Sequence, residues 1–302
     1  MKKFKFILVA AMAVATLFSC KKDDDKPAPV PVPKPTPEAL KTVAEAKTDD
    51  KEKTYTVRLQ NTTGAFVMGY NDLTLTVVDA AGKEVAVEAA IFTPWMDMFN
   101  KNDKGEYDKN NIMHTHTCPH TALAKEGNVW KSQVLYQMVT GPSGVWFGTI
   151  TFKVAGKDYE LKRLDFEVKP QTNKALGTVN RFRLFSEAKP KGQAHLYALV
   201  APESPKVGEN EIALGIWKME SMKNFPKVTD WTVEVSVKAK DGTEVLSTAT
   251  LRYERDFYRG KVSYPKAGAY ILSYTLKDAQ GNAIQPKNND GVDTTLGTEI
   301  QF

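Results

Sequence analysis

This 302-residue sequence has little cysteine, only a small excess of positive charge and little helical periodicity. Its only cysteines are Cys20 and Cys118, so any internal disulfide would have to join these two. The net charge of +5 includes three lysines that precede a predicted cleavage site, and so balanced a chain gives no indication of a nucleic-acid partner. No stretch after Glu52 sustains a helical period, which favours an all-β fold.

The length and composition are those of a folded protein. At roughly 100–150 residues per domain, the chain can form two globular cores but not a large multidomain enzyme. Hydrophobic residues make up 42% of the sequence and aromatic residues 10%, which excludes disorder throughout the chain.

The N-terminus has the pattern of a signal peptide. Three lysines at positions 2, 3 and 5 precede an unbroken apolar run over residues 6–18, which is shorter than the roughly 20 residues that span a bilayer. The run ends at Leu17-Phe18-Ser19-Cys20, which resembles the lipobox of bacterial lipoproteins. The resemblance implies that residues 1–19 are removed and that Cys20 carries palmitate and the other lipid chains that anchor the protein. A lipidated Cys20 would leave Cys118 without a disulfide partner.

A charged segment and a proline-rich segment follow Cys20. The run Lys21-Lys22-Asp23-Asp24-Asp25 is similar to the surface-export tag of Bacteroidetes-type lipoproteins, although a merely solvated charge run is the alternative. Every second residue from 27 to 37 is proline, which predicts a polyproline II spacer of roughly 34 Å. Residues 20–52 are therefore expected to form a lipid-anchored acidic tag and linker. The predicted location is the outer membrane, facing the cell exterior.

From residue 54 onward the apolar residues recur at every second position. Tyr55, Val57 and Leu59 alternate with polar residues, and similar alternation is found over residues 73–78 and 146–152. Turns rich in Gly, Asn and Asp separate these runs. The pattern is typical of antiparallel strands with one buried face, and it predicts β-sandwiches.

Parts of the pattern occur twice. Residues 68–75 are echoed by residues 207–214, residues 79–85 by residues 240–245, and residues 146–152 by residues 258–264. We therefore expect two tandem immunoglobulin-like β-sandwiches, at residues 53–170 and 171–302, with loops of different length on a shared frame.

Most of the residues that carry chemistry lie in one short segment. Three of the four histidines and Cys118 fall in Met113-His114-Thr115-His116-Thr117-Cys118-Pro119-His120. In an extended strand, His114, His116 and Cys118 share one face, and Pro119 would end the strand and turn His120 to another angle. The same arithmetic places the thioethers of Met96 and Met98 on one face, and Met113 adds a third.

These residue types predict a site for a soft or borderline metal. Imidazole, thiolate and thioether ligands suit Cu(I) first and Zn(II) second, whereas Ca²⁺ and Mg²⁺ require oxygen ligands that the segment lacks. The alternatives are methionines that only fill the core and histidines that are only structural. A Cys-dependent redox or hydrolytic enzyme is a third hypothesis, but no nucleophile-elbow or protease signature surrounds Cys118.

Residues 54–302 resemble the FixH/YtkA-like immunoglobulin-fold domains. The resemblance is carried by Pro205-Lys206-Val207-Gly208-Glu209-Asn210, by the Met-rich loop and by the closing strand Tyr258-Arg259-Gly260-Lys261-Val262-Ser263-Tyr264. It implies copper handling outside the cytoplasm, with a loop that contains Met96, Met98, Met113, His114, Cys118 and His120. The second domain departs from the pattern, because residues 230–240 contain no Met, His or Cys. His195, Met219 and Met222 are interpreted there as mainly structural.

The sequence therefore predicts a non-enzymatic envelope lipoprotein that captures copper, delivers it or confers tolerance to it. His114, His116 and Cys118 are the expected first ligands, and His120, Met96, Met98 and Met113 complete the site or capture the ion. The expected partners are the membrane, through the lipid anchor, and an envelope copper-handling protein, with no nucleic acid. The rival hypothesis is a surface adhesion or scaffolding module of a lipoprotein complex, in which the His/Cys loop is incidental.

Overall fold

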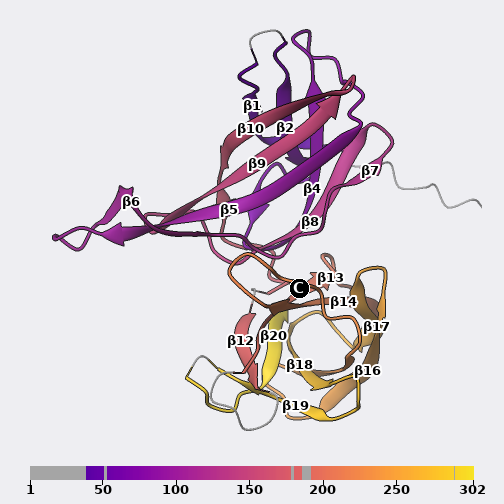
Figure 1. Cartoon of the computed structure of the whole chain (residues 1–302). Coiled ribbons are helices and arrows are strands. Elements are labelled where there is room, and N and C mark those ends of the chain that lie inside the picture. Colours follow the sequence, from indigo (N-terminus) through magenta and orange to yellow (C-terminus); the bar gives the residue numbers. More distant parts are fainter. Residues whose placement is uncertain (1–38, 51–52, 178–179, 186–191, 289) are drawn as a thin grey trace, which may run out of the picture. The chain divides into compact units, whose positions relative to one another are not determined.

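The computed structural model describes residues 39–302, apart from residues 51–52, 178–179, 186–191 and 289 (Figure 1). The predicted signal peptide, Cys20, the acidic tag and the proline-rich spacer lie outside the described residues. The predicted linker over residues 20–52 is too long, because residues 41–47 form a strand that pairs with the strand over residues 56–61 and belongs to the first sheet. Within the described ranges the chain forms twenty strands and no helix, so the predicted all-β class is confirmed. Consequently, this part of the chain contains no helix long and apolar enough to cross a membrane.

Residues 41–169 form two main sheets. One has the strand order β1-β2-β4-β8-β7, with β1 (Lys41–Lys47), β2 (Thr56–Asn61), β4 (Gly69–Val78), β8 (Val129–Tyr136) and β7 (Ala124–Glu126). The other has the order β10-β9-β5-β6, with β10 (Lys157–Phe166), β9 (Gly144–Val154), β5 (Ala89–Lys101) and β6 (Tyr107–His116). Two short strands, β3 (Phe66–Val67) and β11 (Val168–Lys169), pair in parallel beside them.

The two sheets of this first half enclose one hydrophobic core. Leu59 and Leu75 of the first sheet lie in the same buried cluster as Met96, Trp146 and Ile150 of the second. The alternation predicted from the sequence is confirmed in β9, where buried and partly exposed residues alternate along most of the strand. Two sheets that share one core are consistent with a β-sandwich.

Residues 180–301 form one sheet of nine strands, in the order β15-β16-β17-β14-β13-β12-β19-β18-β20. β15 also pairs with β18, so this sheet closes on itself instead of dividing into two. β16 joins the two faces, because its first part pairs with β15 and its last three residues pair with β17. The strand bounds are β12 (Asn180–Phe185), β13 (Ala194–Ala201), β14 (Gly208–Met219), β15 (Thr232–Ala239), β16 (Val245–Glu254), β17 (Phe257–Tyr264), β18 (Ala269–Lys277), β19 (Ala283–Lys287) and β20 (Leu296–Gln301).

The two halves repeat one set of antiparallel pairs. In the first half β4 pairs with β2 and β8, and β5 pairs with β6 and β9. In the second half β14 pairs with β13 and β17, and β15 pairs with β16 and β18. By this correspondence β17 takes the place of β8, so the predicted match between residues 146–152 and 258–264 is wrong. Residues 79–85 follow β4, whereas residues 240–245 join β15 to β16, so that match is wrong as well.

The first predicted repeat, residues 68–75 with 207–214, is the same structure twice. Asn71 accepts a hydrogen bond from the Val67 backbone N–H and donates to the backbone oxygens of residues 67 and 69. Asn210 makes the same three bonds to residues 206 and 208. Gly69 and Gly208, at φ values of 112° and 91°, adopt the positive φ that this turn needs.

A buried tyrosine lies opposite each of these glycines. Tyr136 pairs with Gly69, and Tyr264 pairs with Gly208. Among the described residues both hydroxyl groups are buried and have no hydrogen-bond partner. The shared turn, the shared partner strand and the matched tyrosines together define one frame that is built twice.

Candidate metal centre

The predicted ligands of β5 and β6 meet in two cross-strand pairs. Met96 lies directly opposite His116, and Met98 lies opposite His114. Residues two apart in a strand share a face, so two thioethers and two imidazoles lie on one face of the hairpin. We call Met96 with His116 the inner rung and Met98 with His114 the outer rung. Directly opposed Cβ atoms are about 4.5–5.5 Å apart, so the two side chains of a rung can reach one ion.

The two rungs differ in burial. Met96 is fully buried and His116 is 5% exposed, whereas Met98 and His114 are each half-buried. The centroids of the two imidazole rings lie 5.7 Å apart, which makes the rungs neighbours along the strands. The donor set therefore extends from a partly open position into the core of the first half.

Gly144 of β9 makes room for the two thioethers. It pairs with Met98 across the β5–β9 ladder. A Cβ atom at this position would lie 2.8 Å from Met98 Sδ, 2.8 Å from Met96 Cε and 2.7 Å from the Asp97 backbone oxygen. Any side chain here would displace the methionines and push β5 away. No local sequence pattern marks Gly144, because its role depends on which strand lies beside β9.

Trp146 and a backbone carbonyl position the inner-rung histidine. Trp146 pairs with Met96 across β5 and β9, and its ring lies edge-on to the His116 ring at a centroid distance of 5.9 Å. His116 Nδ1 donates a hydrogen bond to the Thr117 backbone oxygen at 2.9 Å. Because a carbonyl oxygen only accepts, Nδ1 is the donor and carries a proton. A backbone partner on one ring nitrogen is the usual arrangement of a metal-binding histidine.

The opposite face of the hairpin holds the two strands in register. Asp97 lies between the two methionines, and Thr115 lies opposite it between the two histidines. Thr115 Oγ1 donates to Asp97 Oδ1 at 2.7 Å, and Arg163 Nη1 of β10 donates to Asp97 Oδ2 at 2.8 Å. The Arg163 guanidinium also lies 3.9 Å from the centroid of the Phe147 ring. The Asp97 carboxylate, which is only 4% exposed, thus ties β5 to β6 and β10 directly behind the rungs.

Cys118 and His120 lie beyond the end of the strand. β6 ends at His116, so the extended stretch stops two residues short of the predicted Cys118. Cys118 is fully buried in the core of the first half, and burial raises the pKa of its thiol well above the ordinary value. The thiol is therefore protonated at neutral pH and would have to lose a proton to bind a metal. His120 Nδ1 donates to the Cys118 backbone oxygen at 2.8 Å, and burial lowers the pKa of this imidazole.

Met113 occupies a β-bulge. Met98 pairs with His114 and the next residue, Phe99, pairs with Ile112, so Met113 has no partner on β5. Its side chain is 51% exposed. In the ranges that the structure covers, no three His, Cys, Asp or Glu side chains come together in a group that could hold a metal ion. The donors that the register does bring together are the two imidazoles and two thioethers of the rungs.

The matching place in the second half carries no such donors. Trp146 lies two residues after Gly144 and pairs with Met96. In the second half Tyr270 lies two residues after Gly268 in the same way, and it pairs with Ala239. Ala239 therefore takes the place of Met96. His195 is buried with its ring 4.8 Å from that of Trp231, and burial lowers the pKa of its imidazole to about 4. It is therefore a neutral packing residue at physiological pH.

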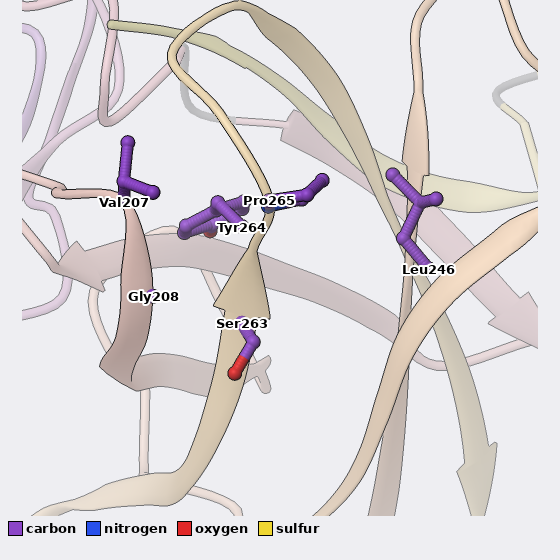
Figure 2. Close-up of a pocket in the computed structure, with 6 residues that line it drawn as sticks. All are labelled: Val207, Gly208, Leu246, Ser263, Tyr264 and Pro265. Carbon is purple, nitrogen blue, oxygen red and sulfur yellow. The ribbon is translucent and has the colours of Figure 1, made fainter.

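The second half has an apolar pocket of about 330 Å³ (Figure 2). Its lining residues are Val207, Gly208, Leu246, Ser263, Tyr264 and Pro265, from the starts of β14 and β16 and the end of β17. This lining contains no carboxylate, imidazole, thiol or thioether. The pocket is therefore not a metal site.

No protein-family model matches the chain, and no curated protein matches it significantly. The resemblance to FixH/YtkA-like domains stays a prediction.

Replacement of Thr115 by Val should loosen the hairpin. The Asp97 carboxylate would lose one hydrogen bond, and bonds to charged groups contribute about 1.5–3 kcal/mol. We expect the free energy of unfolding, measured by urea denaturation, to fall by about 1–2 kcal/mol. Thr151→Val, at an exposed position of β9, is the matched control and should change it by less than about 0.5 kcal/mol. Equal stability of the two variants would contradict a role for Thr115 in holding the register.

Proposed function

We propose that this protein is a non-enzymatic envelope lipoprotein that binds Cu(I) on the β5–β6 hairpin, for capture, delivery or tolerance of copper. The observation that carries the proposal is the register of the two strands. It pairs Met96 with His116 and Met98 with His114, on one face and beside a glycine. Packing alone does not call for two histidines opposite two methionines at the edge of a core.

The chemistry of these donors favours copper in its reduced state. Thioethers are soft, uncharged ligands that select Cu(I), and imidazole binds Cu(I) well. Zn²⁺ is the second choice, because its protein sites use thiolate, imidazole and carboxylate rather than thioether. Neutral donors leave the bound ion with its single positive charge, which is less costly to bury than the double charge of Zn²⁺.

The proposed ligands are the four rung residues. This set differs from the one predicted from the sequence, in which Cys118 was a first ligand. In the proposal Cys118 stays a protonated core residue and His120 stays bound to its carbonyl, because a buried neutral thiol is a poor ligand until it ionises. Asp97, Thr115 and Gly144 position the ligands without touching the metal.

The remainder of the proposal concerns location and domain structure. The lipobox-like sequence before Cys20 and the following acidic run support an outer-membrane lipoprotein that faces the cell exterior. The repeated strand pairs support two immunoglobulin-like domains, of which only the first binds metal. A copper-handling protein of the envelope is the proposed partner.

Replacement of both Met96 and Met98 by Leu should abolish tight copper binding without loss of the fold. Leucine keeps most of the buried volume, and swaps of this kind usually cost less than about 1.5 kcal/mol. Residues that only hydrogen-bond to metal ligands and orient them contribute roughly 10–100-fold to metal affinity. We therefore expect the loss of two ligands to weaken Cu(I) binding on the order of 100-fold or more. Anaerobic competition titration of the detergent-solubilised full chain with a chromogenic Cu(I) chelator measures this affinity.

The matched control replaces two methionines outside the rungs, Met68 and Met138, with Leu. Both are half-buried in the first half, so the double change is similar in size. It should leave the Cu(I) affinity unchanged. If wild type binds no Cu(I), or if both double variants bind as tightly as wild type, the copper proposal fails and the adhesion or scaffolding hypothesis replaces it.

Replacement of Cys20 by Ala should release the protein from the membrane. The acyl chains are the only proposed anchor, and each buried CH₂ group contributes about 0.8 kcal/mol to membrane binding. Fractionation of cells should find the wild type in the membrane fraction and Cys20→Ala in the soluble fraction. Retention of Cys20→Ala on membranes at high salt would contradict the lipoprotein assignment.

A further inference from the structure

The sulfur and nitrogen donors of the hairpin form a series from solvent to core. Met113 is 51% exposed, the outer rung is half-buried, and the inner rung is buried with exposures of 0% and 5%. The hairpin also projects past its neighbour, because β5 pairs with β9 only as far as Met98 but continues to Lys101 (Figure 1). The exposed end of the series therefore lies where β5 no longer pairs with β9 and pairs only with β6.

Met113 is the extra residue of a β-bulge in β6. Between the pairs Met98–His114 and Phe99–Ile112, β6 has one residue more than β5, and Met113 is that residue. A β-bulge leaves its extra residue outside the ladder and re-aims its side chain, and bulges are frequent beside functional sites. Consecutive Cα atoms are about 3.8 Å apart, so the long, flexible methionine side chain lies within reach of the outer rung.

Packing does not account for a methionine at this position. Methionines usually fill irregular gaps in a core, and Met113 leaves half of its surface in water. The bulge itself has no need of a thioether. A soft donor that is exposed, carried on a flexible side chain and adjacent to a metal-ligand pair is suited to taking an ion from solution or from a carrier.

We propose that Met113 is the entry ligand of the site, and this inference rests on the proposed copper function. Cu(I) binds first to the Met113 thioether, and the ion then passes to the outer rung and finally to the inner rung. Each transfer is a ligand exchange, in which a bond from copper to one sulfur breaks as a bond to the next sulfur or nitrogen forms. Copper stays Cu(I) throughout, and the thioethers have no proton to lose.

An entry ligand affects rates without affecting the final equilibrium. It lowers the barrier for uptake and for release by the same amount, so its loss slows both and leaves Kd unchanged. A rung ligand behaves in the opposite way, because its loss raises Kd. The two roles are therefore separable by experiment.

The test measures how fast the detergent-solubilised full chain takes Cu(I) from its complex with a chromogenic chelator, by anaerobic stopped-flow absorbance. We expect Met113→Leu to slow uptake about tenfold, which corresponds to about 1.4 kcal/mol of barrier, with Kd unchanged. Deletion of Met113 removes both the donor and the bulge, and should slow uptake to the same extent. Met68→Leu, at a half-buried methionine of the first half outside the rungs, should leave the rate at the wild-type value.

Three results would overturn the inference. Uptake by Met113→Leu at the wild-type rate would exclude an entry role, and so would equal slowing in Met68→Leu. A rise in Kd for Met113→Leu as large as that for Met96→Leu/Met98→Leu would make Met113 a permanent ligand. In each of these cases the wild type still binds Cu(I), so the proposed function stands. An absence of Cu(I) binding by the wild type would instead overturn both proposals.

Discussion

The register of β5 against β6 is the constraint on which the candidate centre depends. Because side chains alternate between faces, a slip of one residue would turn both histidines towards the face that holds Asp97 and Thr115. The Asp97 carboxylate opposes such a slip from behind, through hydrogen bonds to β6 and β10. The regular pairing ends at Met98, where the bulge begins. The part of the hairpin that is held most firmly is thus the part that carries the four donors.

The second half shows what the frame needs for folding alone. It repeats the glycine–asparagine turn, the buried tyrosine and the order of strand pairs, and yet it places Ala239 where the first half has Met96. A frame that folds with alanine at this position does not require a thioether there. The donors of the first half are therefore better explained as an addition to the frame than as part of its core, which is the reason to assign them a ligand role.

The sequence predicted the features that depend on local pattern. Alternation predicted strands, and two-residue spacing correctly placed Met96 with Met98 and His114 with His116 on shared faces. Features that depend on which strands become neighbours were beyond it. Nothing in the local sequence places Gly144 under two methionines, and a bulge at Met113 is not visible in a period-two pattern. Pro119 predicts that the strand ends after Cys118, whereas β6 ends at His116, two residues earlier than that prediction.

X-ray absorption at the copper K-edge, on the full chain loaded anaerobically with Cu(I), tests the ligand assignment most directly. Copper bound by the rungs has both sulfur and nitrogen neighbours. The sulfur signal should disappear in Met96→Leu/Met98→Leu and should persist in Cys118→Ser. Loss of the sulfur signal in Cys118→Ser, with its retention in the methionine double variant, would contradict the account and identify the buried thiol as the ligand.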